Sequence, residues 1–469
     1  MARHPFVAVN LISDPIHGYI ELTKRLSAAG AEAAGLPAED AAEDDLLDTA
    51  WLQRLRRISQ LQSARWVFPT AEHSRFTHGL GVMHEAGLWA RSLYPSLRAA
   101  LPTAAPGEPI PSEGLVVETL RIAGLLHDVG HGPFAHFFDD HVLATFDAPA
   151  DPRRGGAKRL THEDLSQRII EGELSPLIRG LRRAPGAVPE RDAFADGESI
   201  DPRWVAFLIA KPALADGEMP RWVRWLAPLL SGVFTVDNLD YVRRDAYLTG
   251  VAAGPVDVER LRRYTFVSDR GLTLYEPGLG ALEMFLTARR FMYQQVYFHR
   301  TVRAIDLDLA EVFGPSVRAI FGDGSPADRL AAYADLDEYA LLHQAARWAR
   351  GESVAARSAP GDGIVTAEVA AAWRAILLRR PTWRAEAEIR AEYAAGAFPA
   401  ELVATLGPAE PGAVAIDLAV VDAVPPAPGA VDALLALERR DGSSPSLAEA
   451  LASIPAFWLI GRRYRRRQA

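Results

Sequence analysis

The stretch LLHDVGHGPFAHFFD, from Leu125 to Asp139, decides how the rest of the chain is interpreted. It holds three histidines within ten residues, interrupted by two glycines and a proline, and His127 is followed directly by Asp128. Histidine handles protons near neutral pH and is the commonest metal ligand in proteins. The stretch therefore predicts a metal site, a proton-transfer site or a polar helix end, and other parts of the chain must separate these alternatives.

The residues that lead into this stretch predict a helix. VVETLRIAGLLHD, from Val116 to Asp128, repeats its apolar side chains at helical intervals, and the Gly-Pro-Phe that follows ends the helix. Similar periodicity predicts helices over residues 46–62, 78–93, 162–171, 237–248 and 282–307. Beyond residue 310, alanine-rich helices are expected to about Leu406. Strand patterns are short: LTLYEP at 272–277, and alternating apolar residues within 408–431 that predict a small β unit.

The chain is therefore predicted to be mainly α, a helical bundle with a few short strands and a C-terminal region of helices and some strand. We expect a core over residues 1–310, with an insertion at about 23–45, and an accessory region over 311–469 that ends in a basic tail. A length of 469 residues favours two such parts over one compact core. Three polar or small-residue segments predict loops, at 27–45, 147–158 and 183–199.

Composition narrows the class of protein. No run approaches the roughly 18 apolar residues that span a membrane, and the N-terminus lacks a signal-like apolar segment, so a cytoplasmic protein with no membrane partner is expected. The absence of cysteine means that any metal must be held by histidine, carboxylate or water. The net charge of −9 argues against a nucleic-acid coat. The basic end, GRRYRRRQA from Gly461, predicts a solvated tail, with contact to polyphosphate, nucleic acid or a neighbouring subunit as the alternative.

Histidines gather in one part of the chain. Eight of the twelve lie within a 90-residue window, at positions 73, 78, 84, 127, 131, 136, 141 and 162. His127 and Asp128 stand side by side at a helix end and can converge on one ion lying off that end. His78 and Asp237 are candidates for the remaining ligands. A shell of histidine and aspartate suits Mg²⁺, Mn²⁺ or a transition ion such as Fe²⁺, Ni²⁺ or Zn²⁺ better than a closed structural zinc site.

The predicted helix at 237–248 carries a polar face. Asp237, Tyr241 and Asp245 recur every four residues, so two carboxylates and a tyrosine share one side of the helix. Such a face fits a binding site better than a core or a solvated surface. The alternative is that Asp240 and Asp245 form surface salt links with the arginines at 243 and 244.

A second helical stripe combines arginine and tyrosine. Arg289, Tyr293, Tyr297 and Arg300 are spaced four, four and three residues apart. Arginine with tyrosine on one stripe can clamp phosphates and contact a sugar or base. An aromatic core stripe flanked by surface arginines is the alternative.

Five motifs in order carry a resemblance to a known family. They are DPIHGYIEL (14–22), QRLRRISQL (53–61), VFPTAEHSRFTHGLGV (67–82), LLHDVGHGPFAH (125–136) and DNLDYVRRD (237–245). Together they resemble the HD-domain phosphohydrolases, and within them the deoxynucleoside triphosphate triphosphohydrolases that include the sterile-alpha-motif and HD-domain enzymes. The resemblance covers roughly residues 7–305 and implies an HD-domain helical bundle.

The resemblance implies roles for named residues. It assigns the metal to His78, His127, Asp128 and Asp237. It places Gln60, Leu61, Arg75, Tyr241, Asp245, Arg289 and Tyr297 around the substrate. It gives proton and phosphate handling to His131, His136 and His162, of which His136 is our expected general acid at the α-phosphate. Glycine usually follows the Gln-Leu pair in the family, but Gln62 stands there, and Asn238 stands where a phosphate-binding lysine is found.

The implied reaction is hydrolysis of a dNTP to deoxynucleoside and inorganic triphosphate, by a homo-oligomer that is a dimer or tetramer. A guanine nucleotide, GTP or dGTP, is a further expected activator, at a site matched by Asp48, Gln53, Arg56, His299 and Arg300. The alternative for the first three is an amphipathic helix that makes its own salt links. Two other functions stay open: an HD enzyme for a monophosphate, cyclic nucleotide or alarmone, and a nucleotide-sensing or nucleic-acid-binding regulator.

Overall fold

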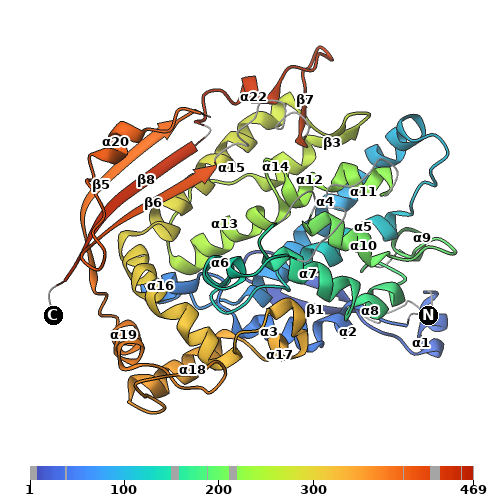
Figure 1. Cartoon of the computed structure of the whole chain (residues 1–469). Helices are drawn as coiled ribbons and strands as arrows, with labels where there is room; N and C mark the ends of the chain where they lie inside the picture. The colour runs from blue at the N-terminus through green and yellow to red at the C-terminus, as the bar shows by residue number, and fades with distance from the viewer. Residues whose placement is uncertain are drawn as a thin grey trace.

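The computed structural model describes residues 8–36, 40–148, 158–186, 188–210, 219–394, 396–422, 434–455 and 457–467. Helices form the body of the molecule, and a three-stranded sheet stands along one side of it (Figure 1). The prediction of a mainly α fold with a C-terminal region of helix and strand is confirmed.

The centre of the body is built from α4 (Arg75–Ala104) and α5 (Glu113–Leu126), which pack along each other. Ser112 caps α5 by accepting a hydrogen bond from the Leu115 N–H, and nearly every residue of α5 is buried. Helix α13 (Val236–Thr249) packs on α4; Thr235 begins it and Gly250, with a φ of +72°, ends it. These helices deliver the polar residues of the predicted site to one place.

Helix α7 (His162–Glu171) lies beside α10 (Pro202–Ala210) and begins at a capping box formed by Thr161 and Asp164. The short helix α6 (His136–His141) precedes it in the chain. Helix α15 (Leu279–Met292), the π-helical turn η5 (Tyr293–Tyr297) and α16 (Arg300–Phe321) follow one another. The predicted helix at 282–307 is therefore interrupted at residues 298–299.

The remaining helical segments are short and surround this centre. They are α1 (Ala28–Ala34), α2 (Glu43–Leu47), α3 (Ala50–Arg54), η1 (Leu55–Arg57), η2 (Gln62–Trp66), η3 (Leu143–Thr145), α8 (Ser175–Gly180), α9 (Pro189–Asp192), α11 (Arg221–Leu226), α12 (Pro228–Ser231), α14 (Val258–Arg263), η4 (Glu276–Gly278), η6 (Pro326–Asp328), α17 (Leu330–Ala334), α18 (Glu338–Ala349), α19 (Ala367–Leu377), α20 (Ala400–Ala404) and α22 (Leu447–Ala450).

In the described part of the chain, strands form three small sheets. β1 (Val9–Asp14) pairs antiparallel with β2 (Gly18–Thr23). β3 (Thr265–Ser268) pairs antiparallel with β4 (Gly271–Tyr275), which confirms the strand predicted at 272–277, and β7 (Ala436–Glu438) adds a parallel strand. β8 (Phe457–Arg466) lies between β5 (Trp383–Tyr393) and β6 (Val414–Asp422), antiparallel to both.

Several predicted boundaries are wrong. The loop expected at 27–45 holds α1 and most of α2, and the helix expected at 46–62 breaks into α2, α3 and η1. The helix expected to continue to residue 406 ends at Leu377, and β5 follows. Alanine and glutamate in this segment favour a helix in isolation, but pairing along β8 overrides that weak preference. Most of the predicted loop at 147–158 and the end of the predicted β unit, from residue 423, lie outside the described residues.

The basic C-terminal segment is a central strand, so the prediction of a solvated tail is wrong for residues 461–466. Arg462 is buried, with 3% of its surface exposed, and its Nε donates to Glu388 on β5 at 2.7 Å. Arg465 donates to Glu386 at 2.6 Å. Cross-strand pairing with glutamates of β5 neutralises the arginines and lets them stand inside a sheet.

The predicted division at residue 310 falls inside α16. One apolar cluster joins residues from β2 to α22, and the buried Tyr333 donates its hydroxyl to the Gly130 carbonyl at 2.8 Å. The division into two parts remains a prediction: the main cluster crosses residue 310, whereas the C-terminal sheet also packs in two small apolar clusters around Tyr464 and Trp458. Among the described residues, no helix is long and apolar enough to cross a membrane.

Candidate functional site

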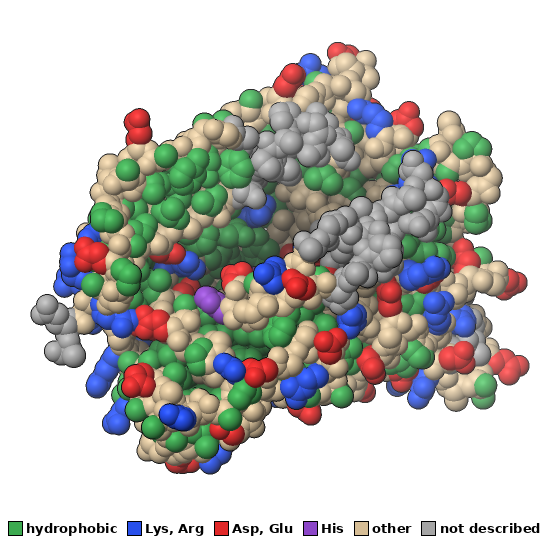
Figure 2. Space-filling model, viewed as in Figure 1, with side chains coloured by type: hydrophobic (Ala, Val, Ile, Leu, Met, Phe, Trp, Pro, Cys, Tyr) green, Lys and Arg blue, Asp and Glu red, His purple; other side chains and the backbone are tan. Residues whose placement is uncertain are grey.

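A cavity of about 400 Å³ collects most of the residues predicted for the site. The surface is hollowed between the sheet and the helical body, and a histidine lies in the hollow (Figure 2). The lining includes Gln60, Leu61, Gln62, Ser63, Arg75, His127, Asp128, His136, His162, Glu163, Asp237, Tyr241, Asp245, Tyr293, Tyr297, Phe298, Arg303 and Asp306. A cavity of this size suits a nucleotide-sized ligand.

Four predicted metal ligands converge at one end of this cavity. The Nε2 atom of His78 lies 3.0 Å from Oδ1 of Asp237, and that of His127 lies 3.7 Å from the same oxygen. His127 Nε2 also lies 3.3 Å from Oδ1 of Asp128. Ligand atoms of His78, His127 and Asp128 all lie within 4.8 Å of one another. We call these four residues the ligand quartet; α4, the end of α5 and the start of α13 supply them.

The chemistry of the two histidines fits a divalent ion. Nδ1 of His127 lies 2.8 Å from the Gly124 carbonyl oxygen. A carbonyl can only accept, so Nδ1 carries a proton, and in the neutral imidazole the Nε2 lone pair is then available to an ion. This Nε2 is buried and has no hydrogen-bond partner among the described residues. An orphaned buried nitrogen aimed at two carboxylates is the arrangement that a metal ion would complete.

Asp240 holds the other histidine. Its Oδ2 lies 2.8 Å from Nδ1 of His78, so Nε2 of His78 faces the quartet. Asp240 is fully buried. It also accepts a hydrogen bond from Nε of Arg244 at 2.8 Å and lies 2.6 Å from Nε2 of His17. A Cβ on Gly81 would stand 2.0 Å from Oδ1 of Asp240, so only glycine leaves room for this approach. The alternative of a surface salt link at Asp240 is wrong, because the pair is buried.

Arg75 touches the quartet directly. Its Nη1 donates to Oδ2 of Asp128, both side chains are buried, and its Nε has no partner among the described residues. Burial alone would raise the pKa of Asp128, but the charge of Arg75 holds it well below its usual range. Asp128 is therefore a carboxylate, and Arg75 places a positive charge at the wall of the cavity.

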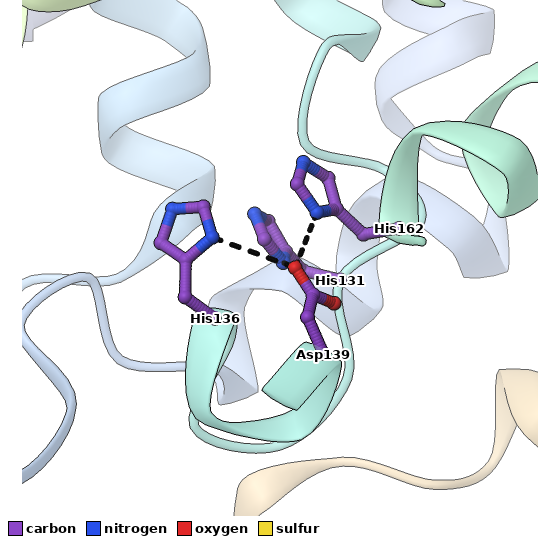
Figure 3. A group of neighbouring side chains, drawn as sticks. All are labelled: His131, His136, Asp139 and His162. Carbon is purple, nitrogen blue, oxygen red and sulfur yellow. Dashed lines mark hydrogen bonds and ion pairs between the residues drawn. The ribbon is translucent and has the colours of Figure 1, made fainter. Parts of the chain in front are cut away.

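A second polar group lies next to the quartet. Asp139 accepts from Nδ1 of His162 at 2.5 Å, and Nδ1 of His136 lies 3.4 Å from the same oxygen. Both imidazoles turn toward Asp139, and His131 lies beside them (Figure 3). Burial would raise the pKa of Asp139, but its hydrogen bonds with His136 and His162 lower it strongly. We call His131, His136, Asp139 and His162 the histidine relay; these four could also hold an ion by their spacing.

The members of the relay differ in exposure. His136 is 62% exposed at its side chain and lines the cavity together with His162. His131 is fully buried, stacks on His162 at 3.7 Å and has its Nε2 3.3 Å from Asp128. Burial and the charges of Arg75 and His162 hold the pKa of His131 well below its usual value. His136 and His162 are therefore placed to meet a substrate, whereas His131 stands behind them as a neutral side chain.

The turn that leads from His131 to His136 is tight. Phe134 and Ala135 both have positive φ, at 60° and 49°, which is unusual for residues with a Cβ. Glu338 stabilises this turn by accepting from the Phe134 N–H at 3.2 Å and from the Ser59 N–H at 3.2 Å. A Cβ on Gly130 would stand 2.1 Å from the His162 carbonyl oxygen. The chain bend predicted from glycine and proline is present, but the left-handed residues are Phe134 and Ala135.

The predicted sugar residues form a network of their own. Asp245 is buried; its Oδ2 accepts from the Tyr297 hydroxyl at 2.6 Å and its Oδ1 lies 2.7 Å from Nε2 of His73. Tyr241 stands between this network and the quartet, with ring centroids 6.1 Å from Tyr297 and 6.5 Å from His78. Gln60 and Leu61 line the same cavity, and Oε1 of Gln60 is buried without a partner among the described residues.

The arginine and tyrosine stripe is divided by the π-helical turn. The Arg289 guanidinium lies 5.8 Å from the Tyr293 ring, and neighbouring tyrosines outweigh burial so that its pKa is raised. Tyr293 and Tyr297 line the cavity and lie 4.9 Å apart, whereas Arg300 is exposed at the start of α16. The tyrosines thus face the cavity and Arg300 stands at the surface, while Arg289 does not line the cavity and its role in phosphate binding stays a prediction.

The residues matched to an activator site have contacts of their own. Gln53 accepts from Nε of Arg56 at 2.9 Å, and Arg56 stacks over Phe76 at 3.7 Å. Asp48 and Arg300 are exposed, and His299 packs on Phe68 at 5.7 Å. These contacts do not join the two groups into one site, so the activator site remains a prediction.

Three functional groups were missed in the sequence. Asp139 stands one helical turn after His136, a spacing that could have pointed to it. Asp240 and His73 have no local signal, because their partners lie 162 and 172 residues away in the chain. Asn238 was noted in the sequence only because the family has a lysine at this position. It caps α13: its Oδ1 accepts from the Thr235 N–H at 2.7 Å.

Comparison with known families agrees with this geometry. Residues 75–188 match the HD domain and residues 256–357 match the HD associated region. The chain therefore carries an HD domain and an HD associated region, and the resemblance drawn from its motifs is confirmed. It is similar to deoxynucleoside triphosphate triphosphohydrolases.

This chain is similar to several known proteins over part of their length. The deoxynucleoside triphosphate triphosphohydrolase SAMHD1 of Homo sapiens is 27% identical over 354 residues, which cover 71% of this chain and 49% of that protein. Its Dictyostelium discoideum homologue is 26% identical over 65% of this chain and 48% of its own. YwfO of Bacillus subtilis is 30% identical over 64% and 54%. The chain thus spans about half the length of these relatives.

Two solved structures share the fold over almost the whole chain. A hypothetical protein from Aquifex aeolicus superimposes with a TM-score of 0.65 and 24% identity, covering 98% of this chain and 96% of that one. A phosphohydrolase from Bacteroides thetaiotaomicron gives a TM-score of 0.63 at 21% identity, covering 98% and 100%. The likeness extends through the C-terminal sheet, which the sequence motifs do not reach.

Proposed function

We propose that this protein is a metal-dependent phosphohydrolase that converts a deoxynucleoside triphosphate to deoxynucleoside and inorganic triphosphate. One observation carries the proposal: members of the ligand quartet, of the histidine relay and of the Asp245–Tyr297 network line one cavity, namely His127, Asp128 and Asp237, His136 and His162, and Asp245 and Tyr297. These three groups match the three needs of the reaction, which are charge neutralisation, proton transfer and recognition of a deoxyribose.

The ligand quartet would hold the ion. A divalent ion bound by His78, His127, Asp128 and Asp237 would neutralise phosphate charge and favour deprotonation of a water molecule. The protein fixes the Nε2 atoms toward that point through Asp240 and the Gly124 carbonyl. Arg75 contributes a permanent positive charge at the same wall, beside a polyanionic substrate.

The histidine relay would protonate the leaving group. His136 is the exposed member and its Nδ1 faces the Asp139 carboxylate, so its Nε2 can donate to the departing 5′-oxygen. Asp139 remains ionised because its pKa is lowered, and it stabilises a positively charged imidazole beside it. His162 hydrogen-bonds the same carboxylate and lines the cavity, which suits contact with a phosphate oxygen.

The Asp245–Tyr297 network would select the sugar. A buried carboxylate and a tyrosine packed at the 2′ face of a ribose leave little room for a further hydroxyl group, and Asp245 can accept from a 3′-hydroxyl. Asp245→Ala should raise KM or relax discrimination against ribonucleotides while metal content stays unchanged.

The decisive test is product analysis. Purified protein is incubated with each dNTP and Mg²⁺ or Mn²⁺, and inorganic triphosphate is separated from monophosphate and diphosphate. Release of triphosphate is expected; release of monophosphate alone, or turnover of a cyclic nucleotide or alarmone in its place, would contradict the proposal. An Asp128→Ala sample run in parallel identifies activity from contaminating phosphatases.

Guanine-nucleotide activation and assembly are a second part of the proposal. Running the same assay with and without GTP, while mass is measured in solution, tests both. An activated homo-oligomer predicts that GTP raises turnover and that Arg56→Ala removes this response. Turnover that is independent of GTP would refute the activator site and leave the hydrolytic proposal standing.

A further inference from the structure

One wall of the cavity has a polar character that the reaction does not use. Gln62, Ser63, Arg303 and Asp306 line it, from η2 and α16. The Ser63 hydroxyl donates to Oδ1 of Asp306, and Nη1 of Arg303 donates to Oδ2 at 3.2 Å. Asp306 is 13% exposed at its side chain, so it is a largely buried carboxylate at the edge of a ligand cavity.

Both chain segments that form this wall adjoin the sugar network. Gln62 and Ser63 directly follow Gln60 and Leu61, and α16 with Asp306 follows Tyr297 and the π-helical turn. Tyr241 separates the sugar network from the ligand quartet. A nucleotide whose phosphates lie at the quartet and whose sugar lies at Asp245 therefore presents its base to this wall.

The charge of the wall decides what it can accept. Arg303 forms a bidentate pair with Asp417, at 3.0 Å and 2.6 Å, in addition to its bond to Asp306. Arg462, which stands opposite Asp417 in the sheet, is paired with Glu388. One guanidinium is thus shared between two carboxyl groups, and burial raises the pKa of Asp306. The oxygens of Asp306 can accept hydrogen bonds from the N–H donors of a ligand.

A strained residue adds to the wall. Gln62 has a φ of +51°, in the left-handed region where glycine is usual, and its side chain lines the cavity. A residue other than glycine is strained in that conformation, and such strain is typical of functional positions. Its amide can donate to a carbonyl oxygen of a base beside the carboxylate.

We infer that Asp306 reads the Watson–Crick edge of the substrate base and selects guanine, with Gln62 donating to its carbonyl oxygen. Guanine presents two adjacent N–H donors, from its ring nitrogen and its exocyclic amino group, to one carboxylate. Cytosine and adenine present only an exocyclic amino group, and thymine only one ring N–H. The inference rests on the proposed function for the orientation of the nucleotide.

The test uses binding, so that it does not depend on turnover. Affinities of deoxyguanosine and deoxyinosine are measured by calorimetry on the full chain with a chelator present; the two ligands differ only by the exocyclic amino group. Wild-type protein is expected to bind deoxyguanosine about tenfold more tightly, and Asp306→Asn should reduce that ratio to near one. Equal affinities in wild type, or a ratio that persists in Asp306→Asn, would overturn the assignment.

Two variants control for structural effects. Glu311→Gln makes the same chemical change on the exposed side of α16 and should leave the ratio at its wild-type value. Asp417→Asn breaks the other ion pair of Arg303; retention of the ratio there, with loss in Asp306→Asn, excludes an effect through the sheet. Loss of the ratio in both variants would overturn the direct reading of the base by Asp306.

Failure of the two proposals can be told apart. Triphosphate release from dNTPs with no preference for deoxyguanosine refutes the base assignment and keeps the hydrolytic proposal. A tenfold preference that depends on Asp306, without triphosphate release, keeps the base assignment and refutes the hydrolytic proposal.

Discussion

The ligand quartet and the histidine relay are built from the same residue types but differ in the hydrogen-bond partners of their histidines. In the quartet, each histidine has its Nδ1 occupied by a protein acceptor, the Gly124 carbonyl or Asp240, and turns Nε2 to a common point. In the relay, His136 and His162 direct Nδ1 to a single carboxylate. The hydrogen-bond partner of Nδ1 therefore distinguishes a metal-binding imidazole from a proton-transferring one. Both groups are nevertheless compact enough to hold an ion.

Removal of a quartet carboxylate should have the largest effect. Asp128→Ala is expected to lose bound metal and to lower kcat by about a thousandfold or more, because the ion supplies several kcal/mol of charge stabilisation. Metal content by elemental analysis and triphosphate release measure the two effects. Asp140→Ala, on the exposed surface of α6, is the matched control. If Asp128→Ala retains the metal, the assignment of the quartet as the metal site is wrong.

Removal of the exposed relay histidine should separate turnover from metal binding. His136→Gln is expected to lower kcat by about a hundredfold while metal content stays at the wild-type level. His141→Gln, the same change on the same helix, should leave both unchanged. If His136→Gln releases the metal, the relay is part of the metal site and the distinction between the groups is wrong.

Asp240 tests whether the partner of Nδ1 matters. Asp240→Asn is expected to weaken metal affinity by about tenfold, because the amide holds the His78 ring less firmly and makes it a poorer donor. Titration with metal against a chelating indicator gives the affinity. Asp14→Asn removes the other carboxylate of Arg244 without contacting His78. Equal losses in both variants would assign the effect to the buried ion pairs and not to His78.

Glu338 tests the stability of the fold near the relay, and neither metal binding nor turnover. Burial raises the pKa of its carboxyl to about 7, above the ordinary 4.5, although Arg65 and two backbone N–H groups oppose the shift. Between these values the folded state binds more protons than the unfolded state, so stability falls as pH rises. The free energy of unfolding of wild type should decrease relative to Glu338→Gln by up to about 3 kcal/mol from pH 5 to 8.

Denaturant unfolding at several pH values measures this difference. A difference that is independent of pH would show that Glu338 does not titrate in this window. An increase with pH would mean that its folded-state pKa is depressed, and that the turn at Phe134 is held by a permanent carboxylate.

Local periodicity accounts for what could be predicted. The helices at 113–126, 162–171 and 236–249 were found close to their true ends, because each has an apolar repeat, a capping residue and a breaker within the segment. The order of five motifs was sufficient for the family. The sequence also indicated which side chains to examine, since the histidines are clustered and the carboxylates lie one helical turn apart.

Contacts between distant segments account for what could not be predicted. Asp240 reaches His78 across 162 residues, and its importance depends on the absence of a side chain at Gly81. The arginines of 462–466 resemble a solvated tail until the glutamates of β5 are placed beside them. The wall at Asp306 exists only because η2 and α16 meet.

The sequence by itself determined the helical class, the resemblance to HD-domain phosphohydrolases and the side chains expected to form the site, because these depend on residue type and short-range spacing. Only the tertiary structure decided which nitrogen of each histidine is free, which carboxylate is buried and where the basic segment lies. The physical reason is that hydrogen-bond partners and desolvation are properties of the packed chain, and they set the chemistry of a side chain as strongly as its identity does.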